Sequence, residues 1–515
     1  MNSKLSSDSD QIVLATQQRW GLFLAAAIAS GTGLATELLL GTLASYLAGN
    51  QALSYGLAIG IFLAALGLGS YLSQFIASDD DWEKLLIRFC QIELVLGPLI
   101  ALLPLGLFGL FVWDRFLWLG LGLVTLVIGT LAGLEIPLLV RILERQQATK
   151  QAISQVLALD YLGALVGSLL FPTLLLPLLG MFPSAALLGT LPPLVGFGLG
   201  LLFPELRRWG WSGLVIGGLL ALFIPFATQA GDRLENSLYD APVVYREQSA
   251  YQRIVLTRWR DDLRLFLDGD LQFSSFDEYR YHEALVHPAL SLVSAKQVLV
   301  LGAGDGLALR EILKYPNIEQ VILVELDPSV VRLAKTHPRL SAINHNAFSD
   351  PRVNVIYGDA FRIAPSLLEK FDLIVADFPD PDQPSLAKLY SQEFYQQLRS
   401  HLTPNGVLAT QATSPFFAPK AYQCIAQTLH AAGFESYPYQ AQVPSFGPWG
   451  FILASLKPLN LQSMSLQAET QYLTPQLLGA LFLLPGDLAV SETKVNRLTQ
   501  PTVTNYLLDR RWDLY

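Results

Sequence analysis

The sequence has little cysteine, little histidine and no run of basic residues. Its two cysteines, Cys90 and Cys424, lie far apart in the chain, so neither a disulfide framework nor a cysteine zinc site is expected. The six histidines show no metal-ligand spacing. A net charge of -9 without a basic cluster argues against a nucleic-acid surface. We therefore expect neither a bound metal nor a nucleic-acid partner.

Charged residues are also scarce between residues 20 and 228, whereas residues 229–515 have the mixed composition of a soluble domain. A chain of 515 residues is too long for one ordinary core, so at least two domains are expected. A helix crosses a bilayer with about 20 apolar residues. Seven stretches meet that length: 21–47, 52–77, 88–111, 116–140, 155–179, 183–203 and 210–228. We therefore predict a multi-span α-helical transmembrane domain over residues 1–228, with a polar tail at residues 1–18.

Four acids fall inside or near the ends of these stretches: Glu37, Glu93, Glu135 and Asp160. A carboxylate within a bilayer is costly and is by default a functional candidate, for example on a transport or substrate path. The alternative is a protonated or hydrogen-bonded helix contact, or an acid at the membrane interface. The sequence offers no matching set of basic partners, and both interpretations stay open.

Residues 297–327 combine strand, glycine turn, helix, strand and acid. The apolar run 298–301 ends in the turn 302–306, Gly-Ala-Gly-Asp-Gly, and the apolar run 321–324 ends in Glu325. Glycines let the backbone approach a ligand closely. An acid about twenty residues beyond the turn is placed to accept hydrogen bonds from a ribose. This pattern predicts a nucleotide-type site, with Gly302 and Gly304 at the ligand. The alternative, a tight turn in a structural sheet, would leave Asp305 and Glu325 without a role.

Further strands are expected at 353–357, 371–376, 406–411 and 451–455, between helices such as 328–335 and 419–432. This alternation predicts a parallel sheet with the ligand at the carboxyl ends of its strands. We expect an α/β Rossmann-like, S-adenosylmethionine-type nucleotide-binding domain over residues 291–455. A small β-rich lead-in over 229–290, with a hairpin around residues 260–262, precedes it. Residues 456–515 form a tail to which we assign no chemistry.

The acids of this domain fall at or just beyond strand ends: Asp305, Glu325, Asp359, Asp377 and Asp380. Asp359 is placed to accept a hydrogen bond from an adenine amino group. Asp377 and Asp380 flank Phe378 and Pro379, and such carboxylates would attract a polycationic amine. One of them could take a proton from an ammonium group, which must lose it to become a nucleophile. The plainer alternative is a set of solvated turn acids.

Asp305 adds a constraint on the ligand. A carboxylate beside the glycine turn would lie near the amino-acid end of a bound S-adenosylmethionine, where it would repel a ligand carboxylate. A decarboxylated cofactor with an aminopropyl arm fits better. If the protein bound both cofactors equally well, this hypothesis would fail.

With these features together, residues 245–455 resemble the polyamine aminopropyltransferases, the spermidine synthase family, and the membrane half resembles that of its multi-span membrane-fused members. The match covers about two fifths of the chain and is specific as a set. The matching stretches are 249–252 (SAYQ), 267–269 (LDG), 277–283 (DEYRYHE), 302–306 (GAGDG), 324–327 (VELD), 358–360 (GDA) and 377–381 (DFPDP).

The resemblance implies transfer of an aminopropyl group from decarboxylated S-adenosylmethionine, a co-substrate, to putrescine, giving spermidine and 5'-methylthioadenosine. It implies no tightly bound cofactor and an oligomer. The resemblance assigns Asp377 as the general base. It further implies contacts to the nucleoside from Gln252, Glu325, Asp359, Ala360 and Pro384, and contacts to the amine or the aminopropyl arm from His282, Asp305 and Asp380.

The chain departs from the family in its segment 443–449. Soluble members carry a tyrosine there whose hydroxyl helps hold the amine, whereas this chain has Phe446. That change leaves the acceptor amine open. Two other functions stay open as well: a methyltransferase that uses S-adenosylmethionine, and a polyamine transporter or sensor that binds nucleoside without turnover.

Loop charges conflict with the expected location of the catalytic half. The larger groups of basic residues are Lys4 with Arg19, Lys84 with Arg88, Arg141 with Arg145 and Lys150, and Arg207 with Arg208, while the other loops hold only Arg115. The positive-inside rule then places the N-terminus in the cytoplasm, and seven spans put the C-terminal half outside. We nevertheless expect a multi-pass protein of the cell membrane with a cytoplasmic catalytic half, because the co-substrate is a cytosolic metabolite.

Overall fold

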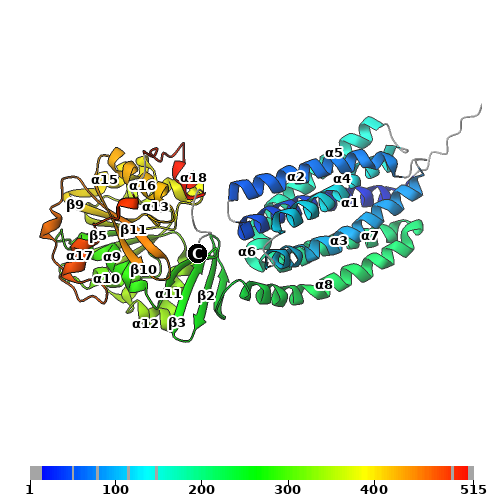
Figure 1. Ribbon diagram of the computed structural model, residues 1–515. Helices are drawn as coiled ribbons and strands as arrows, with labels where there is room; N and C mark the ends of the chain where they lie inside the picture. The colour runs from blue at the N-terminus through cyan, green and yellow to red at the C-terminus, as the bar shows by residue number, and fades with distance from the viewer. Residues whose placement is uncertain are drawn as a thin grey trace, which may run out of the picture. The chain divides into compact units, whose positions relative to one another are not determined.

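The computed structural model describes residues 14–48, 51–76, 81–112, 116–144, 149–488 and 492–508. It divides the chain into two compact units, Met1–Asp240 and Ala241–Tyr515 (Figure 1). The expected boundary at residue 228 lies inside α8 (Arg207–Asn236), so the helical unit extends further than the apolar run. Most of the predicted N-terminal tail, and the loop residues Arg115 and Arg145, lie outside the described residues.

The first unit is helical. Its elements are α1 (Thr16–Ala48), α2 (Gln51–Leu72), η1 (Ser73–Phe75), α3 (Trp82–Val112), α4 (Leu117–Glu144), α5 (Thr149–Leu170), the π-helical turn η2 (Phe171–Leu175), α6 (Leu176–Leu179), α7 (Met181–Leu202), η3 (Pro204–Leu206) and α8. Among the described residues, seven helical segments are long and apolar enough to cross a membrane. They correspond one to one with the seven predicted stretches.

Glycines let these helices approach one another closely. A Cβ atom added to Gly163 of α5 would lie 2.0 Å from the carbonyl oxygen of Ala27 in α1. One added to Gly133 of α4 would lie 2.3 Å from the carbonyl oxygen of Leu66 in α2. Such backbone contacts through small residues are typical of helix packing in lipid.

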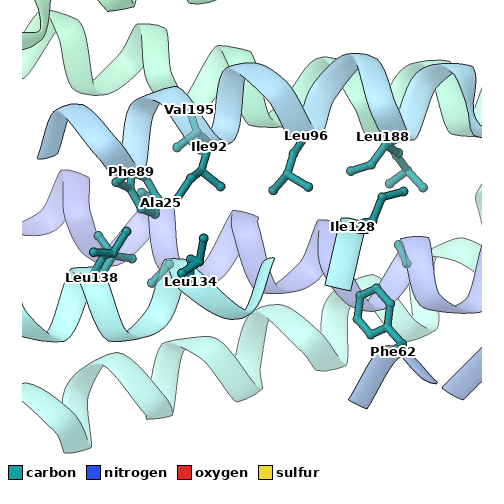
Figure 2. Packing of buried hydrophobic residues seen from close by; sticks show 14 of the residues in the cluster. Ala25, Phe62, Phe89, Ile92, Leu96, Ile128, Leu134, Leu138, Leu188 and Val195 are labelled. Atoms are coloured by element: carbon teal, nitrogen blue, oxygen red, sulfur yellow. The ribbon is translucent and has the colours of Figure 1, made fainter. Parts of the chain in front are cut away.

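Apolar side chains occupy both the inside and the outside of this bundle. Figure 2 shows Leu96 and Ile92 of α3 pointing into the interior, toward Leu134 and Leu138 of α4. On the outside, Leu222 of α8 is 69% exposed, one of many exposed large apolar residues on these helices. Proteins that work in water rarely expose such continuous apolar surface.

The second unit contains two sheets. The strands β1 (Val243–Gln248), β2 (Arg253–Trp259), β3 (Asp262–Leu267) and β4 (Asp270–Ser274) form an antiparallel sheet in chain order. The larger sheet has the order β10-β11-β9-β8-β5-β6-β7. Its strands are β5 (Gln297–Gly302), β6 (Gln320–Glu325), β7 (Val353–Tyr357), β8 (Phe371–Asp377), β9 (Leu402–Gln411), β10 (Glu435–Val443) and β11 (Gly447–Ser455).

The larger sheet is parallel as predicted except at the predicted strand 451–455, which lies in β11 and is antiparallel because a hairpin from β10 leads into it. Strands β7, β6, β5, β8 and β9 pair in parallel, and β11 and β10 follow as antiparallel strands at one edge. The middle strands are buried along their length, which explains their continuous apolar sequences. Strands β1 and β10 were not predicted. In β10, Ser436, Pro438 and Gln440 interrupt the apolar pattern on which the prediction relied.

The helices of this unit connect and cover the strands. They are α9 (Glu278–Leu290), α10 (Leu307–Leu313), α11 (Pro328–Thr336), α12 (Pro338–Ile343), α13 (Ala360–Ile363), α14 (Pro384–Ala387), α15 (Gln392–His401), α16 (Pro419–Ala431), α17 (Pro475–Ala480) and α18 (Thr502–Leu508), with short 3-10 turns that include η6 (Lys388–Tyr390). Helix α11 begins with Pro328, as the sequence predicted.

The segment expected to be a separate tail after residue 455 belongs to this unit. Leu473 and Leu478 join the core cluster that contains Val298 of β5, and Val503 joins the cluster that contains Leu299, on the other face of the sheet. Glu283 of α9 accepts hydrogen bonds from three consecutive backbone N–H groups at residues 471–473, at 2.6–2.9 Å. The described parts of this segment therefore belong to the folded α/β unit.

Candidate active site

The glycine turn lies between β5 and α10 and needs its glycines. Gly302 and Gly306 have φ angles of +80° and +82°. A Cβ atom on Gly302 would lie 2.1 Å from the backbone oxygen of Asp377, at the end of β8. One on Gly304 would lie 2.7 Å from a carboxylate oxygen of Glu325, at the end of β6. The turn thus lies directly against two of the predicted acids.

Gln252 and Glu325 are positioned through one shared residue, Asp327. The Asp327 backbone N–H donates to Glu325 Oε1 at 2.9 Å. The Asp327 side chain accepts from Gln252 Nε2 at 3.1 Å and from Ser249 Oγ at 2.6 Å, and it caps α11 through the N–H of Ser329. The two predicted nucleoside contacts therefore lie at one edge of the sheet, joined by a buried aspartate.

The Asp359 carboxylate already accepts hydrogen bonds from two donors. As the N-cap of α13 it accepts from the Phe361 backbone N–H at 3.0 Å, and Lys388 of η6 donates to its other oxygen at 2.6 Å. Pro384 opens α14 just before Lys388, and Ala360 is the buried first residue of α13. A carboxylate has about four acceptor positions, so Asp359 can still accept from an amino group.

Asp377 ends β8 and is held by a tyrosine. The hydroxyl of Tyr281, in α9, donates to Asp377 Oδ1 at 2.7 Å. Burial raises the pKa of Asp377 to about 6, against the opposing positive charge of His282 and together with the negative charge of Asp305. Burial also raises the pKa of Tyr281, so its phenol stays protonated and donates. The acid is thus ionised at neutral pH, yet more basic than an exposed aspartate.

Asp380 lies in the loop after β8. Thr413 Oγ1 donates to Asp380 Oδ2 at 2.9 Å, and Gln411 Nε2 approaches Oδ1 at 3.4 Å. Burial raises the pKa of Asp380 to about 7, although both hydrogen bonds act in the opposite direction. Gln411 also donates to the Phe378 carbonyl oxygen at 2.8 Å, which secures the loop between the two acids.

His282 is charged because of a buried ion-pair network. Its Nδ1 lies 2.9 Å from Glu278 Oε2, and Arg310 forms two hydrogen bonds with the Glu278 carboxylate, at 2.7 and 2.9 Å. Burial acts against the imidazolium, but the hydrogen bond and the charge of Glu278 raise the pKa of His282 to about 9. His282 therefore contributes a positive charge beside Asp305 and Asp377.

Asp305 and Glu325 complete the acidic lining. Asp305 Oδ1 accepts from the Leu307 backbone N–H at 2.9 Å, and burial raises the pKa of Asp305. Burial likewise raises the pKa of Glu325 to about 7, and the charges of Asp327 and Asp305 add to that rise. The structure therefore brings the predicted acids into mutual electrostatic range at the carboxyl ends of β5, β6 and β8.

The segment that carries Phe446 is fixed against α9. Asp277 precedes that helix and accepts from the N–H and the hydroxyl of Ser445, at 2.6 and 2.9 Å. The Phe446 ring lies 6.1 Å from the Tyr281 ring, centroid to centroid. Phe446 has no hydroxyl, and the hydroxyl of the neighbouring Tyr281 donates to Asp377.

Three contributors to this site were not singled out from the sequence: Tyr281, Asp327 and Lys388. Tyr281 stands beside His282 in the stretch 277–283, so its position in a recognisable motif was the available signal. Asp327 before Pro328 is a helix-capping pattern, which pointed to structure rather than to the ligand. Nothing in the sequence marks Lys388. Within the described ranges, no group of three or more His, Cys, Asp or Glu residues is arranged to hold a metal ion.

The chain is similar to known proteins over its α/β unit and beyond it. Residues 278–465 match the model of the spermine/spermidine synthase domain. A polyamine aminopropyltransferase 2 of Ralstonia nicotianae is 43% identical over 502 residues, which cover 94% of this chain and 97% of the relative. A polyamine aminopropyltransferase of Leptospira interrogans is 39% identical over 508 residues, with 96% and 98% covered.

Among solved structures, a spermidine synthase in complex with the transition-state analogue AdoDATO is 27% identical, with a TM-score of 0.45. The match covers 48% of this chain and 86% of that one. The two bacterial relatives, by contrast, align over nearly the full length, so the alignments include the helical unit as well as the α/β unit. The chain therefore belongs to the polyamine aminopropyltransferases, the spermidine synthase family, and is an aminopropyltransferase enzyme.

Proposed function

We propose that the α/β unit transfers the aminopropyl group of decarboxylated S-adenosylmethionine to putrescine, with Asp377 as the general base. The observation that carries this proposal is the environment of Asp377. It is buried, its pKa is raised to about 6, and Tyr281 orients one of its oxygens. A carboxylate in that state is ionised at neutral pH and can accept a proton.

The acids beside the glycine turn support the co-substrate. In the proposed complex, Asp305 and Asp377 would lie beside the arm of the bound nucleoside, where negative charge repels a carboxylate and attracts an ammonium group. Glu325 and Gln252 would contact the ribose end of that ligand. Asp380 adds a carboxylate in the loop beyond β8, which suits a diamine with two positive ends.

The reaction would be a direct displacement at carbon. The sulfonium makes the adjacent methylene of the aminopropyl arm electrophilic. Asp377 accepts a proton from the attacking ammonium group, and the freed nitrogen lone pair forms the new C–N bond. The C–S bond breaks with its electron pair moving to sulfur, which gives neutral methylthioadenosine. The protein contributes alignment and the base.

Turnover by the detergent-purified full chain tests this proposal. The enzyme is given decarboxylated S-adenosylmethionine with putrescine or other amines, and products are identified by mass. We expect spermidine from putrescine, and a loss of about 10²- to 10⁴-fold in kcat/KM for Asp377→Asn. The matched control is Glu319→Gln, which alters an exposed acid paired with Lys296 and should leave turnover unchanged. Unreduced turnover in Asp377→Asn would refute the base assignment, and product only with another amine would refute putrescine.

We also propose that the helical unit anchors the enzyme in the cell membrane, with the catalytic unit in the cytoplasm. The seven long apolar helices among the described residues, with their exposed leucines, support the anchor. Supply of a cytosolic co-substrate supports the orientation, although the loop charges oppose it. In membrane vesicles of known orientation, external protease should cleave the α/β unit only when the cytoplasmic face is outside. Cleavage in vesicles of the opposite orientation would reverse the assignment.

A further inference from the structure

A small cavity inside the helical bundle contains two of the four acids found in the apolar stretches. Glu93 of α3 and Glu135 of α4 both line it, together with Thr32 of α1. Its volume of about 10 Å³ is the space of one water-sized group. Leu96 and Ile128, which Figure 2 shows in the bundle interior, form part of its apolar wall.

Two polar side chains that line this cavity, Glu93 and Thr32, lack hydrogen-bond partners among the described residues. Glu93 is 0% exposed, and among the described residues no donor lies within hydrogen-bond distance of either of its carboxylate oxygens. Thr32 is 3% exposed, and its hydroxyl also has no partner within the described part of the chain. Leaving such groups unsatisfied in a dry interior is costly.

The charged side chains that line the cavity are all acidic. Its lining includes two carboxylates and no basic side chain. Pro192, from α7, lines it too and removes a backbone N–H from that helix. Two carboxylates in an apolar interior cannot both be ionised unless a cation lies between them. Without such a cation the pair must hold a proton, whereas a positively charged group that donates hydrogen bonds would satisfy both ionised carboxylates.

We propose that this cavity binds one primary ammonium group of an aliphatic amine between Glu93 and Glu135, as a second amine site in the protein. An ammonium group is water-sized and has three donors, which match the two carboxylates and the Thr32 hydroxyl. A bare proton would neutralise one carboxylate and leave the other oxygens unsatisfied. The cavity has room for the ammonium group alone, so the methylenes of the amine would lie between the apolar side chains around it. The inference depends on the bundle alone and not on turnover at Asp377.

Carbodiimide labelling tests the site directly. Dicyclohexylcarbodiimide reacts with a protonated carboxyl group in apolar surroundings, and an empty Glu93–Glu135 pair must hold a proton. A bound ammonium keeps both carboxylates ionised and blocks the reaction. In the detergent-purified full chain, we expect putrescine or butylamine to slow labelling at these residues by about tenfold, measured by peptide mass spectrometry. Sodium and tetramethylammonium, which have no N–H donors, should not protect.

Variants separate this site from the catalytic one. Glu93→Gln and Thr32→Val should each reduce protection of Glu135 by putrescine, and the Thr32 variant serves if the glutamine variant does not fold. Glu37→Gln changes a buried acid of α1 that is not among the residues lining the cavity, and should leave protection intact. Asp377→Asn should also leave it intact, even where turnover is lost.

Four results would overturn the proposal. One is that neither acid is labelled without amine, since the empty pair must then be ionised. A second is that amines fail to protect, and a third is that sodium protects as well as putrescine. The fourth is loss of protection in Asp377→Asn, which would mean that the amine acts through the catalytic unit. Failure of the proposed transfer reaction alone would not alter any of these readings.

Discussion

Glu283 in the α/β unit and Glu93 in the helical bundle are both inaccessible to solvent, with exposed fractions of 1% and 0%, but their surroundings differ completely. Glu283 accepts three backbone hydrogen bonds from residues 471–473. Among the described residues, Glu93 accepts none on either carboxylate oxygen. A buried glutamate thus holds neighbouring backbone in place in one unit and lacks hydrogen-bond partners among the described residues in the other.

The difference extends to the other buried acids of the α/β unit. Glu311 is paired with Arg310, Lys314 and His287, and Asp277 holds Ser445 by two hydrogen bonds. A protein interior normally satisfies its buried charges in this way. An acid that it leaves unsatisfied is therefore a better candidate for binding a ligand than an acid that is merely buried.

The largest effect expected from this comparison is on stability. In Glu283→Gln, an amide NH₂ would replace one acceptor oxygen and face backbone donors at residues 471–473. We expect the free energy of unfolding of the α/β unit to fall by about 3 kcal/mol, as for a buried charge that loses its partners. Pulse proteolysis in urea would measure it, with exposed Glu435→Gln as the control. A change no larger than the control's would mean that these three hydrogen bonds contribute little.

A smaller effect, on activity, tests the acids that face the ligand. Asp377 has a pKa of about 6, raised first by burial and further by the charge of Asp305, and opposed by the charge of His282. If Asp377 is the base, kcat/KM falls about tenfold per pH unit below that pKa, because the protonated acid cannot accept a proton.

Two variants should shift this fall of kcat/KM at low pH, the acid limb of the pH profile, in opposite directions. Asp305→Asn removes a like charge, so the pKa of Asp377 falls and the limb moves to lower pH. His282→Asn removes the opposing positive charge, so the limb moves to higher pH. Measuring kcat/KM against pH for the three proteins distinguishes these shifts from a loss of binding. Shifts of the same sign in both variants would contradict the electrostatic account.

The strand ends explain why the sequence predicted so much of the site. Parallel strands place their carboxyl ends at one edge of a sheet, so Asp305, Glu325 and Asp377 had to converge once β5, β6 and β8 were recognised. Tyr281 could not be found in this way because it comes from α9, 96 residues before its partner Asp377. That contact depends on how α9 packs, which strand periodicity does not encode.

The parts of the fold that the sequence did not predict also depend on long-range packing. Strand β10 is amphipathic only in part, since Tyr439, Ala441 and Val443 are buried while polar residues interrupt the first half. The described residues 456–488 and 492–508 have little regular structure. Glu283 binds part of them to α9 across nearly 190 positions of the chain. Local patterns cannot predict such long-range contacts. In the bundle, length and hydropathy predicted seven helices but not which acids share a cavity.

The smallest expected effect provides the sharpest contrast with Glu283. In the absence of amine, Glu93→Gln should change the stability of the helical unit by less than about 1 kcal/mol, because no protein hydrogen bond is lost and a buried carboxyl group becomes a neutral amide. Hydrogen exchange along α3 in detergent would measure this change, with Glu37→Gln as the control. Amine should protect α3 in the wild type and not in the variant, because only the wild type keeps both carboxylates. If Glu93→Gln instead destabilised the amine-free bundle as strongly as Glu283→Gln destabilises the α/β unit, Glu93 would be a structural residue and the two units would bury their acids alike.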